Sequence, residues 1–241
     1  MNIRYLFLLL ALLAEILGTI GGFGSSVFFV PLGNFYFDFY SVLGLTAVFH
    51  VSSNLSKIVL FKKGLDRRLL LYIGVPSVLF VILGGFLSKY ANDYWLEIIL
   101  GIFLLVFSLF FLVKKEVVVL PTNKNAMVGG TLSGFSAGLL GTGGAIRGLT
   151  MAAFNLKKNA FIATSAFIDF MIDLTRSFVY YGNGYITKDI LIYLPFLIVI
   201  GWVGTYLGKK ILHYIPQEKF RAISLLLILA IGIITLLKVF I

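Results

Sequence analysis

Eight long apolar stretches, separated by short charged or turn-rich joints, restrict the fold of this chain more than any other feature. They lie roughly at residues 5–31, 39–61, 69–88, 94–113, 125–154, 158–181, 190–208 and 222–240. Six of them have about the length of one membrane crossing, roughly 20 residues. The chain is 60% hydrophobic and 12% charged, so a water-soluble globule could not bury its apolar surface. We predict an all-α integral membrane protein, multi-pass in the cell membrane.

The first and fifth stretches are longer than a single crossing and carry glycine clusters near their middles. The clusters are Gly18, Gly21, Gly22 and Gly24, then Gly138, Gly141, Gly143 and Gly144. Because glycine costs about 1 kcal/mol in a helix interior, each cluster is predicted to break its helix. In lipid, a break persists only where protein or water satisfies the freed backbone groups. Gly130, Gly134 and Gly138, spaced by four residues, instead predict close helix packing.

A shift of 119 residues aligns the chain with itself, which predicts two four-segment repeats at 1–120 and 121–241. The matched pairs include Gly22 with Gly141, Gly24 with Gly143, Thr46 with Ser165, His50 with Asp169, Asn54 with Asp173, and Lys57 with Arg176. If each glycine-broken segment dips into the membrane and returns, the second repeat is inverted. Most Lys and Arg of the loops then fall on one side, as the positive-inside rule requires. We expect inverted repeats that each open with a re-entrant or discontinuous helix.

Polar residues recur at helical spacing in the second and sixth stretches, so each set lines one helix face. We predict that Arg176 pairs with Asp173 and that Arg147, in the fifth stretch, pairs with Asp169. Asp169, Asp173 and His50 are the candidates for proton coupling, and Lys57 and Arg176 are supporting charges. A static ion-pair network is the alternative, and His50 could equally be a hydrogen-bond donor. Glu15, inside the first stretch, could brace the first break.

The glycine motifs, from Gly22 to Ser26 followed by Pro31 and from Gly138 to Gly144, resemble the duplicated signature of the TauE/SafE sulfite exporter family. The resemblance covers nearly the whole chain and implies a secondary transporter of small, often sulfur-containing anions, coupled to protons. Ser25 and Ser26 replace two glycines of that signature, and Arg147 is an addition to it. Broken helices present unpaired amides that can hold an anion at the bilayer midplane. The expected substrate contacts are Gly22, Gly24, Ser25, Gly141, Gly143, Gly144, Arg147, Thr46, Ser165 and Asn54.

The remaining features narrow the function class. The net charge of +10 belongs to short loops, so we expect membrane lipid rather than nucleic acid as a partner, and a homo-oligomer is left open. With no Cys and two His, we expect neither a metal site nor a cofactor. Both aspartates share one helix and no His-Glu-x-x-His motif occurs, so an enzyme is not expected. We predict a proton-coupled transporter of a sulfite- or sulfonate-type anion, with a passive anion channel as the alternative.

Overall fold

A computed structural model describes the backbone of residues 3–21, 24–61, 64–114, 119–212, 214 and 217–240, and the side chains of most of them. These residues form helices joined by turns and contain no strand, which confirms the all-α prediction. The helices are α1 (Ile3–Gly21), α2 (Ser26–Gly33), α3 (Phe39–Leu60), α4 (Arg67–Leu69), α5 (Val75–Ser88), α6 (Asp93–Val113), α7 (Asn123–Leu140), α8 (Gly144–Ala152), α9 (Lys158–Gly182), α10 (Lys188–Leu191), α11 (Leu194–Ile211) and α12 (Gln217–Phe240), with a π-helical turn (Leu70–Gly74) joining α4 to α5.

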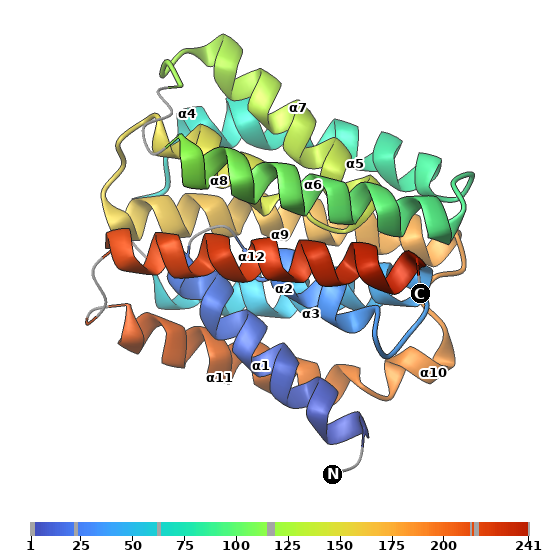
Figure 1. The fold of residues 1–241 in the computed structure, drawn as a ribbon. Coiled ribbons are helices and arrows are strands. Elements are labelled where there is room, and N and C mark those ends of the chain that lie inside the picture. Colours follow the sequence, from blue (N-terminus) through green and yellow to red (C-terminus); the bar gives the residue numbers. More distant parts are fainter. Residues whose placement is uncertain are drawn as a thin grey trace.

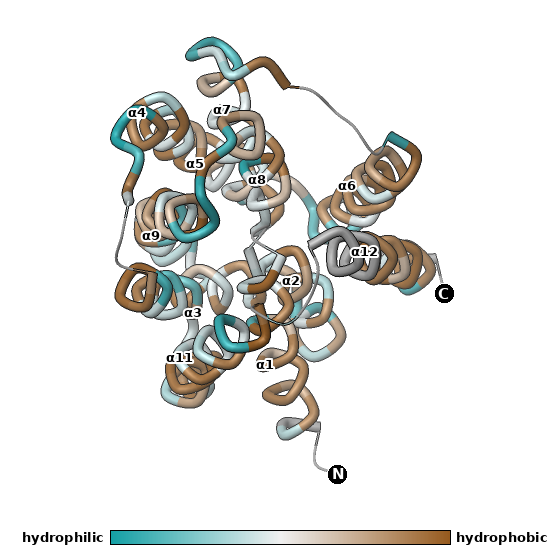
Figure 2. Tube along the Cα trace, turned by 90° about the vertical axis from the view of Figure 1, so that its left-hand side faces the viewer, coloured by the Kyte–Doolittle hydropathy of each residue, from teal (hydrophilic) through white to brown (hydrophobic). Residues whose placement is uncertain are grey.

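Several of these helices suit a lipid environment. In the described part of the chain, four segments are long and apolar enough to cross a membrane: Phe39–Leu60, Arg67–Ser88, Asp93–Val113 and Leu194–Ile211. Shorter apolar helices occupy Tyr5–Gly21 and Leu225–Val239. α9 is long enough to cross but carries several charged residues, which lowers its mean hydropathy. Figure 2 shows that hydrophilic residues gather toward the helix ends and joints.

The helices run roughly side by side, with the short α2 and α8 among the long ones (Figure 1). They form two groups, seen nearly end-on in Figure 2: α1, α2, α3 and α11, and α5, α7, α8 and α9. α3 packs along α9 and so joins the groups, whereas α6 and α12 pack as a pair to one side. α5, from the first half of the chain, therefore packs in the group formed by the second half. α11, from the second half, packs in the group formed by the first half.

Small residues allow the closest helix contacts. A Cβ atom added to Gly130, Gly134 or Gly138 of α7 would overlap the backbone of α5 and of the π-helical turn before it. The predicted packing role of this glycine row is therefore confirmed. Ser77 of α5 adds a hydrogen bond from its hydroxyl to the carbonyl of Gly130 at 2.9 Å. Close backbone approach of this kind replaces the hydrophobic effect as the source of helix association in lipid.

Both glycine clusters lie where one helix ends and a short one begins. α1 ends at Gly21 and α2 begins at Ser26, while Gly24 between them has a φ of 83°. α7 ends at Leu140 and α8 begins at Gly144, with Gly141 at a φ of 75°. Positive φ is strained for residues with a Cβ, so both turns need glycine. Gly22, a predicted contact, lies outside the described residues.

Candidate functional site

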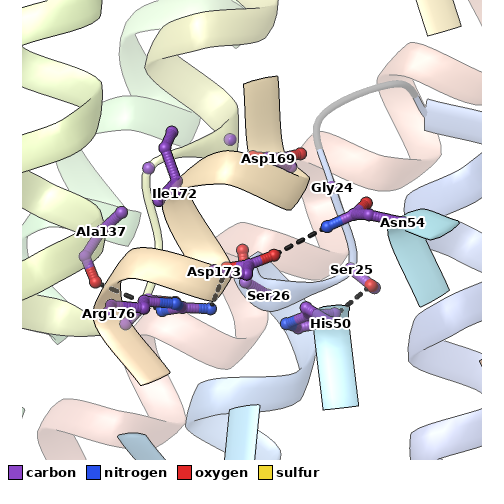
Figure 3. A pocket seen from close by; sticks show the side chains of 13 residues that line it. Gly24, Ser25, Ser26, His50, Asn54, Ala137, Asp169, Ile172, Asp173 and Arg176 are labelled. Carbon is purple, nitrogen blue, oxygen red and sulfur yellow. Dashed lines mark hydrogen bonds and ion pairs between the residues drawn. The ribbon is translucent and has the colours of Figure 1, made fainter. Parts of the chain in front are cut away.

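A narrow polar pocket lies between the two helix groups, where the two helix interruptions meet (Figure 3). It is lined by Gly24, Ser25, Ser26, His50, Asn54, Ala137, Gly141, Gly143, Gly144, Asp169, Ile172, Asp173 and Arg176. The pocket has room for about one water molecule, so the helices are closed around it. Most of the predicted site residues therefore converge from four parts of the chain on one enclosed space.

An ion pair between Arg147 and Asp169 lies beside the pocket. The guanidinium of Arg147, on α8, binds both carboxylate oxygens of Asp169 on α9, and its Nε donates to Ser165 Oγ at 3.1 Å. Arg147 is fully buried, while the side chain of Asp169 keeps 17% of its surface exposed. The predicted pairing is confirmed. It fastens the short helix of the second half to the long helix that follows.

A second ion pair lies within α9, and its two residues also contact α3 and the end of α7. Arg176 Nη2 lies 2.7 Å from Asp173 Oδ1, which confirms the other predicted pairing, and Asn54 Nδ2 donates to Asp173 Oδ2 at 2.7 Å (Figure 3). Arg176 also donates to the carbonyl oxygens of Ala137 and Gly141, at the end of α7. A cation at a helix C-terminus is favoured by the helix dipole. Arg176 therefore stabilises the second interruption.

The two interruptions touch each other. A Cβ atom built on Gly24 would lie 3.8 Å from Arg147 Nη2 and 3.8 Å from Asp169 Oδ2, so Gly24 faces the ion pair. Ser26 donates to the Thr142 hydroxyl at 3.2 Å. α8 begins after Gly143 without a side-chain cap, and the first amides of a helix have no partner within it. Gly143 and Gly144 line the pocket, so this end of α8 contributes positive dipole to it.

A hydrogen-bond network around Glu15 supports the first interruption. Glu15, on α1, is fully buried and lies 2.6 Å from Lys57 Nζ on α3. Its carboxylate also accepts hydrogen bonds from Ser25 at 2.6 Å, from Thr19 at 3.2 Å and from Thr205 at 3.1 Å. The interpretation that Glu15 braces the first break is confirmed. Three of these donors reach Oε1 and one reaches Oε2, so each carboxylate oxygen has a partner within the protein.

His50 reaches the same network through one hydroxyl group. Its Nε2 lies 2.7 Å from Ser25 Oγ, and its ring packs against Phe29 and Phe49. Since the Ser25 hydroxyl donates to Glu15, the hydrogen of this contact belongs to His50 Nε2. The arrangement fits the hydrogen-bond donor that the sequence leaves open as one of two roles for His50.

Two further predicted contacts lie away from the pocket lining. Thr46 is buried and donates its hydroxyl to the carbonyl of Val42, one turn earlier in α3, at 2.6 Å. Ser165 lines a second cavity next to Asp169. The ion pair of Glu15 with Lys57 was not predicted. The sequence held one signal for this pair. Arg147, Arg176, Asp169 and Asp173 balance one another in charge, and Lys57 is left without a partner among them.

A serine motif inside α7 also has a structural explanation. The run from Gly134 to Gly138 has the Gly-x-Ser-x-Gly spacing of hydrolase nucleophiles, but it lies inside α7 rather than at a strand-to-helix turn. The hydroxyl of Ser136 donates to the carbonyl of Thr142. Among the residues that the structure describes, no cluster of three or more His, Cys, Asp or Glu side chains could hold a metal ion.

Comparisons with known proteins point to membrane transport. The family model "Sulfite exporter TauE/SafE" matches residues 7–235, nearly the whole chain. A protein of Methanocaldococcus jannaschii described as a probable membrane transporter is 24% identical, and the alignment covers 90% of this chain and 89% of that protein. No solved structure matches the chain significantly.

Proposed function

This chain belongs to the TauE/SafE sulfite exporter family, a family of membrane transport proteins, and we propose that it carries a small oxyanion of the sulfite or sulfonate type across the cell membrane together with a proton. The pocket between the two helix groups is the proposed site, at the bilayer midplane. Arg147 binds the anion, aided by the amides at Gly143 and Gly144, and Asp169 carries the proton.

The observation that carries this proposal is the position of the Arg147–Asp169 ion pair. It is formed by a short helix that starts at a glycine turn, and it faces Gly24 of the other interruption. Buried ion pairs add little net stability compared with apolar packing, so their presence in a membrane segment favours a functional role. Arginine offers the planar, paired donors that suit an oxyanion.

Charge balance supports coupling to one proton. Arg147, Arg176, Asp169 and Asp173 sum to zero net charge. A monoanion that enters adds one negative charge to a site with little water, which is costly unless another charge changes. Protonation of Asp169 removes that excess and frees the Arg147 guanidinium, which then pairs with the anion instead. Of the two carboxylates, Asp169 is the one whose partner can be exchanged, because Asp173 is held by both Arg176 and Asn54.

The packing of the helices supports an alternating-access mechanism. Asn54 and Asp173, which the 119-residue shift matches, contact each other directly. α1 packs on α11 and α7 packs on α5, so the matched helices make matched contacts. These relations fit inverted repeats around a shared site, with α2 and α8 as the inner arms of two re-entrant hairpins. Rocking one helix group against the other would open the pocket to each side in turn.

Uphill transport in proteoliposomes tests the proposal. Purified protein is reconstituted, a pH gradient is imposed, and uptake of labelled methanesulfonate is followed. This probe is a strong acid and stays ionised, so it does not leak through lipid as a neutral molecule. Coupling of one proton to one anion predicts about tenfold accumulation for each pH unit. Asp169→Asn is expected to exchange anion across the membrane without accumulating it.

The matched control is Glu97→Gln, which removes one partner of an ion pair between α6 and α12, away from the pocket. It should accumulate the anion as the unchanged protein does. Uphill accumulation by Asp169→Asn would contradict the proton role of Asp169. Dissipation of every anion gradient by the unchanged protein, with no accumulation, would instead establish the passive channel.

A further inference from the structure

A second cavity lies next to the proposed pocket, on the other side of Asp169. Gly24, Asn54 and Asp169 line both cavities, whereas Arg176 lines only the first and Lys57 and Ser165 line only the second. The two cavities therefore adjoin each other at the point where Gly24 faces the Arg147–Asp169 ion pair. Each of the two cavities has its own buried cation.

Donor groups around the second cavity are only partly used. Lys57 directs one ammonium hydrogen to Glu15 and another to Ser53 Oγ at 3.0 Å, and the described residues offer no acceptor for the third. The Ser165 hydroxyl accepts from Arg147 Nε, which leaves its own hydrogen without an acceptor among those residues. Asn54 uses one amide hydrogen on Asp173. Each of these side chains is at least nine-tenths buried.

Burying hydrogen-bond donors costs free energy unless an acceptor pairs with them. A buried donor without an acceptor loses hydration and gains nothing in return. Lys57, Ser165 and Asn54 come from two helices, α3 and α9, and each lines the same cavity. An ammonium, a hydroxyl and an amide that converge in this way suit the oxygen atoms of a compact anion.

The charge of Lys57 is balanced by Glu15 in this structure. The groups that face this pair are Thr19 on α1, Ser25 ahead of α2, Ser53 on α3 and Thr205 on α11, and all of them are neutral. The Arg147–Asp169 pair across the cavity also sums to zero. Glu15 is therefore the group that determines how strongly Lys57 attracts an anion.

We propose that Lys57, Ser165 and Asn54 form a second subsite for a small oxyanion, and that Glu15 controls its affinity by competing with the anion for Lys57. The subsite rests on the proposed transport function, since it is a second binding position on the same transport path. An anion held by Lys57 reaches Arg147 by passing Asp169, whose proton removes the negative charge from the passage. Lys57 is thus an anion ligand and not only a structural partner of Glu15.

Binding measurements on the purified full-length protein test this inference. Calorimetric titration with methanesulfonate is compared for the unchanged protein, Glu15→Gln and Glu15→Gln/Lys57→Met. Because Glu15→Gln leaves Lys57 without its competing carboxylate, the affinity should rise by about tenfold or more, the effect of one hydrogen bond to a charged group. Removing Lys57 as well should reverse this gain completely. Glu97→Gln should bind as the unchanged protein does.

Ser165→Ala tests the same subsite without altering any charge, in case the variants at Glu15 do not fold. It removes one donor to the anion and also the acceptor of Arg147 Nε, so we expect binding to weaken by several-fold together with a modest fall in melting temperature. Equal affinity in the unchanged protein, Glu15→Gln and the double variant would overturn the subsite, as would an unaffected Ser165→Ala. If the unchanged protein bound neither methanesulfonate nor sulfite, the proposed function itself would fail.

Discussion

The two helix interruptions use different chemistry, although the 119-residue shift matches them. In the second half, the short helix α8 carries Arg147, which pairs with Asp169 on the following helix. In the first half, the matched positions are Phe28 and His50, and α2 carries no charged residue. Its anchor is instead the neutral hydroxyl of Ser25, held between Glu15 and His50.

The position of the balancing carboxylate also differs. Arg176 pairs with Asp173 on its own helix, three residues away, whereas Lys57 pairs with Glu15 on a different helix. Both halves therefore bury a cation at matched positions and neutralise it from different directions. In the proposed mechanism, the second interruption carries the ion pair, Arg147 with Asp169, that exchanges the anion and the proton. The first interruption is held by hydrogen bonds of Ser25, and the nearby cation Lys57 on α3 is balanced by Glu15 on α1.

Replacement of Arg147 by Met should have the largest effect on this comparison. It leaves the carboxylate of Asp169 without its partner, and breaking a buried ion pair costs about 3–5 kcal/mol. We expect loss of methanesulfonate binding and a large fall in melting temperature. Arg147→Met/Asp169→Asn should recover most of the stability and none of the binding. Recovered binding in that double variant would show that the pair serves only to hold α8 against α9.

Asn54→Asp should have the next largest effect, because it places a carboxylate at both of the matched positions, 54 and 173. The new carboxylate would face Asp173, whose Oδ2 now accepts from Asn54 at 2.7 Å. The added negative charge should weaken anion binding about a hundredfold, measured by calorimetry. Asn54→Asp/Asp173→Asn restores the net charge and should recover much of the affinity. If the exchanged pair bound no better than Asn54→Asp, the place of the carboxylate would matter as much as its charge.

Alanine at the two positive-φ glycines should give moderate and unequal effects. Gly24→Ala meets nothing closer than 3.8 Å, so only backbone strain of about 1–2 kcal/mol is expected. Gly141→Ala adds the same strain and also brings its Cβ to 2.7 Å from Leu43 Cδ2. Thermal unfolding should therefore rank Gly141→Ala below Gly24→Ala. The reverse order would mean that the first turn is the more constrained of the two.

Glu97→Gln should have the smallest effect. The Lys238–Glu97 ion pair, at 3.2 Å, joins α12 to α6, and Lys238 is 34% exposed and also donates to the carbonyl of Asn34 at the end of α2. Neither residue lines either cavity. Accessible ion pairs contribute about 0–1 kcal/mol. Melting temperature and methanesulfonate affinity should both stay close to those of the unchanged protein. A marked loss of binding would show that the packing of α6 and α12 affects the geometry of the pocket.

Local spacing made part of the site predictable. Asp173 and Arg176 lie three residues apart on one helix, so their pairing follows from helix geometry alone. Arg147 and Asp169 were predicted as partners because each was a buried charge that needed compensation. The glycine row at Gly130 and Gly134 predicted close packing, and α5 occupies the space that side chains would fill.

Helical spacing was a weaker guide to individual polar side chains. Thr46 lies one turn before His50, yet its hydroxyl bonds to the backbone of its own helix and is satisfied there. The partner of Lys57 lies in another helix, and no period in the sequence connects it to Glu15. A hydroxyl can choose between a local and a distant acceptor, and only the packed neighbours decide which one it uses.

By itself, the amino-acid sequence determined that this chain is a helical membrane protein of the TauE/SafE family, with glycine clusters in its first and fifth apolar stretches. Those properties depend on composition, segment length and glycine's backbone freedom, which are local. The tertiary structure decided that Gly24 faces Arg147 and Asp169, that Lys57 is balanced by Glu15, and that a second cavity adjoins the pocket. These contacts depend on how helices distant in the sequence pack together, and the hydropathy pattern does not specify that packing.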